Sequence, residues 1–134
     1  MLGQLEHVGI AVRSLAAAIP QYEKMLGCSC YKTEEVAAEK VRTAFFKTGS
    51  TKIELLEALA PDSPIHRFIE KRGEGLHHIA YLVKDMHQEM KRLQAEGFEL
   101  LQTEPKAGAD NKWVCFVHPR SVGGVLTELC QERS

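Results

Sequence analysis

The sequence predicts an α+β fold made of two βαβββ modules in tandem. The first observation is an internal repeat, because residues 5–14 (LEHVGIAVRS) parallel residues 76–85 (LHHIAYLVKD) position by position. The second is a later echo, in which residues 52–56 (KIELL) match residues 126–130 (LTELC). The third is a helical pattern that follows each copy of the first segment. Two such modules are expected to form a cup-shaped mixed sheet.

The chain has 134 residues, of which 44% are hydrophobic, enough for one compact domain without disulfides. We therefore expect a single domain over residues 1–134. Its first module is expected at about 3–60, a connector helix at about 62–73, and the second module at about 74–131.

In the first module, residues 5–12 alternate apolar and smaller or polar side chains, which is typical of a strand. Ser14 is a candidate N-cap for the helix that follows, and Gly27 can end this helix. Pro20 must lie near the first turn or produce a kink. Strands are expected next at 41–47 and 51–58.

In the second module, Asp85 and Gln88 form a capping-box pattern, and Met86, Met90 and Leu93 continue it with helical spacing. Strands are expected at 113–118 and 125–130. Between the modules, Ser63 and Pro64 read as an N-cap followed by a proline at the first helical position, which predicts the connector helix.

Composition excludes several classes of function. With 17 basic and 18 acidic residues and a net charge of -1, no positive field is available for nucleic acid. No basic leader precedes an apolar run, and no apolar stretch approaches the ~20 residues of a membrane span, so we expect no membrane association and a cytoplasmic location. The four cysteines form no CxxC pair, and reduced, mostly buried thiols are expected.

Strand parity selects the candidate histidines. Side chains alternate between the faces of a strand, so His7 shares a face with Gly9 and Ala11, away from the apolar face expected to pack on helices. In the second copy, His78 takes the equivalent position, whereas His77 lies on the helix-side face. His66, His87 and His118 have no partner in the repeat and are expected on the surface or in loops.

Glu54 and Glu128 interrupt apolar strands, where an isolated carboxylate facing an interior is costly without a partner. Taken singly, a strand histidine is more often hydrogen-bonded in a core or on the surface, and a carboxylate is often solvated. Their occurrence at equivalent positions of two halves favours one divalent-metal site made of His7, Glu54, His78 and Glu128. This ligand set suits Co²⁺, Mn²⁺, Ni²⁺ or Zn²⁺ and leaves positions open for substrate oxygens.

The paired βαβββ halves with these four residues resemble the vicinal oxygen chelate superfamily, which has the glyoxalase-like fold. Within it, the chain looks like the methylmalonyl-CoA epimerases. The resemblance covers essentially the whole chain and rests on HVGIAV at 7–12, TKIELLE at 51–57, GLHHIA at 75–80, and HPRS at 118–121 with GGVLTEL at 123–129. Similar stretches also include DSPI at 62–65 and EPK at 104–106 with Gly108.

The resemblance implies an enzyme that interconverts (2R)- and (2S)-methylmalonyl-CoA by proton transfer at C2 through a metal-stabilised enolate. It implies one divalent ion per chain, with Co²⁺ favoured, an acyl-CoA substrate and a homodimer. The family's metal ligands fall on His7, His78 and Glu128, and its fourth position, Gln in some members, falls on Glu54.

Epimerisation calls for two acid/base groups on opposite sides of the substrate. Glu128 is the first candidate, and its alternative role is that of a ligand only. Some epimerases carry Glu where this chain has Thr43, which cannot act as a base at neutral pH. Glu54, if weakly bound, could take that role, as could Glu39 if the alignment shifts by a few residues. Lys106 and Arg120 can neutralise CoA phosphates or the substrate carboxylate, although plain surface charge is the alternative. Trp113 is expected in core or dimer packing.

Two other functions are compatible with the fold. Glyoxalase I uses a metal set of the same type as the four residues here, so only the flanking motifs separate it from an epimerase. Glyoxalase I usually has an Asp-Pro-Asp-Gly turn where this chain has HPRS. A non-catalytic small-molecule-binding module is the third possibility, but such proteins usually lose the ligand residues that are retained here.

Overall fold

The computed structural model describes residues 1–134, and the chain divides into two compact units. One unit is His7–His77, and the other joins Met1–Glu6 to His78–Ser134. The division therefore runs within strands β1 (Leu5–Ala11) and β5 (Gly75–Leu82). The βαβββ order predicted for each half is present, so this part of the predicted fold is confirmed.

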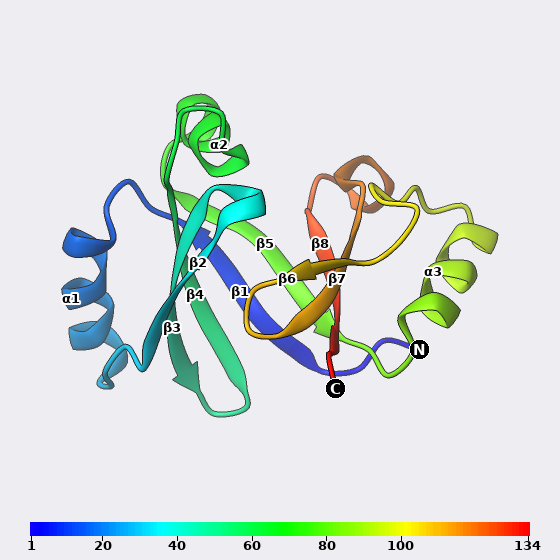
Figure 1. Ribbon diagram of the computed structural model, residues 1–134, viewed down its shortest axis with the longest axis horizontal. Coiled ribbons are helices and arrows are strands. Elements are labelled where there is room, and N and C mark those ends of the chain that lie inside the picture. Colours follow the sequence, from blue (N-terminus) through cyan, green and yellow to red (C-terminus); the bar gives the residue numbers. More distant parts are fainter. The chain divides into compact units, whose positions relative to one another are not determined.

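The unit His7–His77 has a sheet in the order β2-β3-β4-β1, in which β1 and β4 are parallel and the other pairs antiparallel (Figure 1). A 3₁₀ turn at Ala37–Glu39 joins β2 to β3. The remaining elements are α1 (Leu15–Leu26), β2 (Lys32–Val36), β3 (Val41–Thr48), β4 (Thr51–Ala58) and α2 (Pro64–Arg72).

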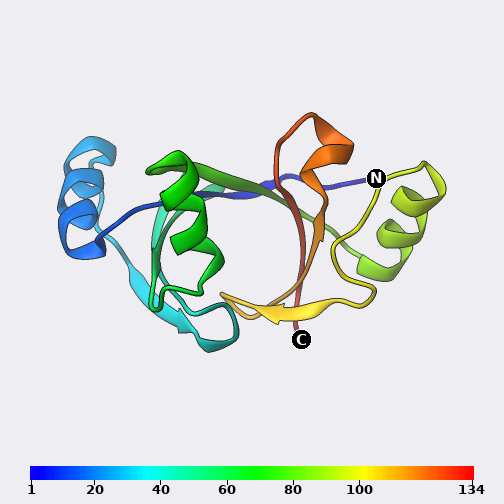
Figure 2. The same ribbon diagram turned by 90° about the horizontal axis from the view of Figure 1, so that it is seen from above.

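The two helices of this unit pack on opposite faces of its sheet (Figure 2). On one face, Leu15 and Ala18 of α1 pack on the fully buried Ala44, Phe46 and Leu55. On the other face, α2 covers one end of the strands, where its Ile65 joins a separate buried cluster made with Ala11, Val41 and Leu56. The same face carries the polar His7, Thr43 and Glu54, together with the fully buried Phe45.

Local signals in the sequence set the ends of α1. The Ser14 hydroxyl accepts a hydrogen bond from the Ala17 N–H at 3.2 Å, and Gly27 ends the helix with a φ of 72°. Pro20 lies inside α1 rather than in its first turn. Because proline has no N–H, this helix lacks one of its internal hydrogen bonds.

The second unit has a sheet in the order β5-β8-β7-β6, in which β5 and β8 are parallel and the other pairs antiparallel. A 3₁₀ turn at Pro119–Val122 precedes β8. The remaining elements are α3 (Met86–Ala95), β6 (Lys106–Gly108), β7 (Lys112–Val117) and β8 (Thr127–Glu132).

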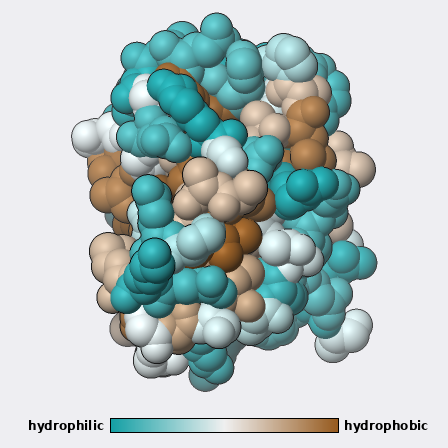
Figure 3. All heavy atoms as spheres, turned by 90° about the vertical axis from the view of Figure 1, so that its left-hand side faces the viewer, coloured by the Kyte–Doolittle hydropathy of each residue, from teal (hydrophilic) through white to brown (hydrophobic).

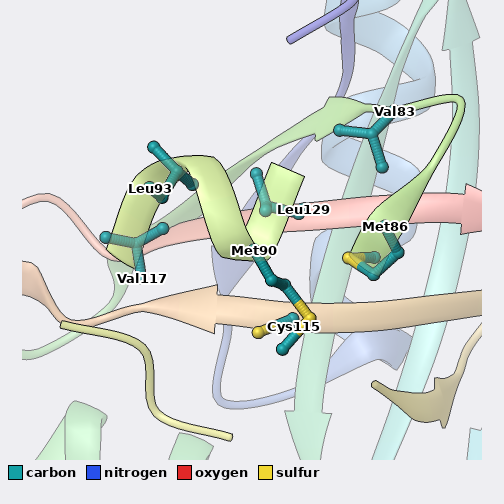
Figure 4. Close-up of a cluster of buried hydrophobic side chains, with 7 residues drawn as sticks. All are labelled: Val83, Met86, Met90, Leu93, Cys115, Val117 and Leu129. Carbon is teal, nitrogen blue, oxygen red and sulfur yellow. The ribbon is translucent and has the colours of Figure 1, made fainter. Parts of the chain in front are cut away.

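Helix α3 packs on strands β7 and β8 of this unit. Figure 4 shows its Met86, Met90 and Leu93 pointing toward Cys115 and Leu129. The Asp85 side chain accepts a hydrogen bond from the Gln88 N–H at 3.1 Å, so the predicted cap is confirmed. A single helix thus packs on one face of the sheet of this unit.

The first residues of the chain belong to the unit of the second half. The Gly3 N–H donates to the Leu82 carbonyl at 2.8 Å, and the Leu82 N–H donates to the Gln4 carbonyl at 2.9 Å. A Cβ atom at Gly3 would lie 2.5 Å from the Leu82 oxygen, so this close approach requires glycine. The Met1 amino group forms an ion pair with the buried Glu89 at 2.8 Å.

The predicted strands differ most from the observed ones at β2, β6 and β8. The short strands β2 and β6 were not located from the sequence, and β8 begins at Thr127 because Val125 follows two glycines in the left-handed region and is exposed.

Trp113 is 39% exposed, and the Arg133 guanidinium lies over its ring, 4.7 Å from the ring centre. The prediction that it packs in the core was therefore wrong, and packing in a dimer stays a prediction.

No helix combines the length and apolar character needed to cross a membrane. The face shown in Figure 3 is largely hydrophilic, with apolar side chains gathered in patches between polar ones. All four cysteines are free thiols, and Cys115 and Cys130 are fully buried, whereas Cys28 and Cys30 are half-buried.

Glu89→Gln should reduce stability in a manner that depends on pH. The Arg92 guanidinium, at 2.6 Å, and the chain's amino group lower the pKa of Glu89 below its usual value of 4.5. A carboxyl with a lowered pKa stabilises the fold above its unfolded pKa, and this contribution is lost as pH falls through the folded pKa. We expect a lower melting temperature for the variant at pH 7, and a difference from wild type that shrinks as the pH falls below 4.5, the usual pKa, in thermal unfolding followed by circular dichroism.

The matched control is Glu96→Gln, an exposed carboxylate just after the same helix. This variant should melt like wild type across the pH range. A difference between Glu89→Gln and wild type that stays constant with pH would contradict the role of the charged carboxylate.

Candidate active site

The unit His7–His77 contains a buried pair of His7 and Glu54. Strand β1 runs parallel to β4 with Gly9 opposite Glu54, so Glu54 projects from the same face as His7. The His7 Nδ1 atom lies 3.2 Å from the Glu54 Oε2 atom, and the two side chains are only 6% and 5% exposed.

The other unit contains an equivalent pair, His78 and Glu128. Strand β5 runs parallel to β8 with Ala80 opposite Glu128, so the histidine again lies two residues before the partner of the glutamate. The His78 Nε2 atom lies 3.3 Å from the Glu128 Oε1 atom, and both side chains are buried. The internal repeat of the sequence therefore becomes a repeated local geometry.

Each pair offers one imidazole nitrogen and one carboxylate oxygen at a separation that fits metal binding. Two ligands held at about 2.1 Å from one ion, with an angle of about 90° to 109° between them, lie about 3.0 to 3.4 Å apart. The same separation fits a hydrogen bond from a neutral imidazole to a carboxylate. Either arrangement compensates the cost of burying the carboxylate, but only the first supplies an electrophile.

Aromatic and cationic side chains lie next to the second pair. Phe116 of β7 is the register partner of Glu128, and its ring meets the His78 imidazole edge-on, with centres 6.0 Å apart. The Lys106 ammonium lies 5.7 Å from the centre of the Phe116 ring. The structure thus brings Lys106 to the strands that carry His78 and Glu128. The alternation of side chains along the strand predicted at 113–118 is the sequence signal by which Phe116 can be found.

Arg120 has a different environment. Its guanidinium forms an ion pair with Glu99 at 3.2 Å, and its side chain is 73% exposed. Its N–H donates to the His118 Nδ1 atom at 3.0 Å, which makes His118 the N-cap of the 3₁₀ turn. Arg120 is therefore a surface residue in a loop, and a role in binding substrate stays a prediction.

The remaining histidines have local partners of their own. His77 meets the ring of Phe68 on α2 edge-on at 5.0 Å, and burial lowers the pKa of His77 to about 4. His66 lies 3.2 Å from Glu70 on the same helix, and the exposed His87 lies 3.3 Å from Glu104.

Thr43 and Glu39 are the two positions considered above, besides Glu54, in connection with a second base. Thr43 lies on a strand of the sheet, whereas Glu39 lies in a turn. Thr43 is only 1% exposed and lies opposite Leu56, which places it on the same face of the sheet as Glu54. Glu39 lies in the 3₁₀ turn before β3, and its carbonyl accepts a hydrogen bond from the Ser63 hydroxyl at 3.3 Å. Glu39 is thus outside the strands that carry the pair.

Comparison with known proteins places this chain in a family. The model of the Glyoxalase/Bleomycin resistance protein/Dioxygenase superfamily matches residues 6–116. The chain belongs to this superfamily. An ethylmalonyl-CoA/methylmalonyl-CoA epimerase from Cereibacter sphaeroides is 42% identical over 133 residues, which cover 98% of this chain and 99% of that protein.

Solved structures of the superfamily agree with this assignment and confirm the predicted glyoxalase-like fold. The methylmalonyl-CoA epimerase from Mycobacterium tuberculosis is 32% identical with a TM-score of 0.95, and the match covers 99% of this chain and 90% of that one. A variant of the Streptomyces coelicolor methylmalonyl-CoA epimerase, in complex with 2-nitronate-propionyl-CoA, is 31% identical with a TM-score of 0.95. That match covers all of both chains.

Proposed function

We propose that this chain is a methylmalonyl-CoA epimerase, which interconverts the (2R) and (2S) forms by moving a proton at C2. The observation that carries the proposal is the buried His–Glu pair present in each half, His7 with Glu54 and His78 with Glu128. These pairs occur on a chain whose relatives of similar length are named as epimerases of methylmalonyl-CoA or ethylmalonyl-CoA.

The two pairs are proposed to hold one divalent ion per chain, with His7, Glu54, His78 and Glu128 as its protein ligands. The support is chemical, because two imidazoles and two carboxylates form a set suited to Co²⁺, which we favour, and also to Mn²⁺, Ni²⁺ or Zn²⁺. The equivalence of the two pairs in the repeat is a second support. When bound, the ion would act as a Lewis acid for the thioester carbonyl and carboxylate oxygens of the substrate.

Proton transfer is assigned to carboxylates of the chain. A carboxylate beside the bound substrate is well placed to remove a proton from a carbon acid. Glu128 is proposed as one acid/base group and Glu54 as the first alternative for the other. Thr43 lies on the face of Glu54 but has only a hydroxyl, which is not a base at neutral pH.

The substrate proposed is an acyl-CoA with a carboxylate next to the thioester. The nitronate in the Streptomyces complex is a planar anion at the carbon next to the thioester, as an enolate would be, although it is that protein's ligand. In this chain Lys106 is a candidate for an anionic group of the substrate, since it lies over Phe116, the neighbour of His78 and Glu128. Arg120 is a weaker candidate because Glu99 already pairs with it.

Three further expectations stay predictions. They are the single-domain organisation with the module bounds given above, a homodimer and a cytoplasmic location.

Purified protein loaded with Co²⁺ should exchange the C2 proton of methylmalonyl-CoA for deuterium in deuterium oxide and should interconvert the two epimers. Proton NMR follows the exchange, and a mutase specific for one epimer reports the inversion. Absence of both, together with turnover of the hemithioacetal of methylglyoxal and glutathione, would instead assign the chain to glyoxalase I.

His7→Ala and His78→Ala should each abolish stoichiometric binding of Co²⁺, because each removes one of two imidazole ligands. His77→Ala is the matched control, since this neighbouring histidine packs on Phe68 and should leave binding intact. Isothermal titration calorimetry measures the stoichiometry and affinity. Full binding by either of the first two variants would contradict the ligand assignment.

A further inference from the structure

The face of the sheet that carries His7 and Glu54 contains a second carboxylate. Paired residues of neighbouring strands share a face, so the register of β1, β4, β3 and β2 identifies every side chain on it. Its members are His7, Gly9 and Ala11 on β1; Lys52, Glu54, Leu56 and Ala58 on β4; Val41, Thr43, Phe45 and Lys47 on β3; and Lys32, Glu34 and Val36 on β2. Glu54 and Glu34 are the two carboxylates among them.

Glu34 lies directly across the ladder from Thr43. The two residues are a register pair of β2 and β3, and Thr43 in turn pairs with Leu56 of β4. Neighbouring strands are about 4.8 Å apart, so the backbone of Glu34 is about 10 Å from that of β4. The side chain of Glu34 is longer than that of threonine. Its carboxylate can therefore extend over Thr43, toward the place that the carboxylate of a glutamate at position 43 would occupy.

The environment of Glu34 suits an acid/base group that also exchanges protons with water. Its side chain is 35% exposed, and the Lys32 ammonium lies 3.8 Å from its Oε1 atom. Lys32 in turn lies 4.6 Å from the centre of the ring of Phe45, which is fully buried and is the register partner of Glu54. The ring of Phe45 thus lies on β3, between the strands that carry Glu34 and Glu54. The neighbour of Glu34 is the Lys32 ammonium, and that of Glu54 is the His7 imidazole.

The other acidic residues of β2, β3 and β4 are excluded by their faces. Glu35 projects from the opposite face and pairs with Arg42 at 2.8 Å. Glu57 also projects from that face, where its carboxylate accepts a hydrogen bond from the Leu15 N–H of α1 at 2.8 Å. Neither faces the side of the sheet that carries His7.

We propose that Glu34, rather than Glu54, is the second acid/base group of the epimerase, an inference that rests on the proposed function. For one epimer, the Glu34 carboxylate accepts the C2 proton, and the electron pair of the broken C–H bond moves into the thioester as an enolate. The group on the other side of the substrate then donates a proton to C2, which inverts the centre. For the other epimer the two groups exchange roles, so no oxidant or co-reactant is needed.

The test is the separation of exchange from inversion in Glu34→Gln. With one acid/base group lost, the remaining group can remove a proton and return deuterium only on its own side. We expect the rate of inversion to fall by at least about 100-fold, while deuterium still enters C2 of one epimer without inversion. The cobalt content per chain and the melting temperature should match wild type, because Glu34 is half-exposed and is not a ligand.

Glu35→Gln is the matched control, since it removes the neighbouring charge on the opposite face of the same strand, and its inversion rate should match wild type. Inversion by Glu34→Gln within about threefold of wild type would overturn the assignment. So would loss of exchange in both epimers with the cobalt content intact, because that pattern marks a residue needed to bind substrate. A wild-type protein that exchanges neither epimer would overturn the proposed function itself, and Glu34 with it.

Discussion

The site depends on the parallel pairing of the first and last strands of each half. Because β1 runs beside β4 and β5 beside β8, a histidine on one strand and a glutamate on the other project from the same face. Residues far apart in the chain thus become a buried pair separated by 3.2 Å in one half and 3.3 Å in the other. Burying a carboxylate in this way is costly unless a cation or a donor compensates it, and this cost explains why the two residue types occur together.

In the unit His7–His77, both helices pack away from the pair of His7 and Glu54. Helix α1 covers the face that carries Phe46 and Leu55, and α2 covers only one end of the other face, around Leu56. On this second face, the polar Glu54 and Thr43 lie beside the apolar Phe45 and Leu56, with which they are paired in register. Packing and chemistry are therefore divided between the two faces of the same strands, as strand periodicity allows.

Much of this arrangement is readable in the sequence because it is repeated. His7 and His78 were separable from His77 by parity alone, and Glu54 was recognisable as a charge inside an apolar strand. The strand that carries Glu34 was not locatable, since its sequence KTEEV has no apolar alternation, and its position follows only from the register with β3. Exposure of Trp113 depends on its register with Gln131 and on the Arg133 side chain, neither of which a pattern in one strand can reveal.

X-ray absorption at the cobalt edge measures whether the two pairs act together on one ion, as we propose. Protein loaded with Co²⁺ should bind one ion per chain, and its spectrum should show two imidazole ligands, with oxygen atoms completing the shell. A spectrum with a single imidazole, or binding of two ions per chain with one imidazole each, would show that the pairs act separately and would contradict the account.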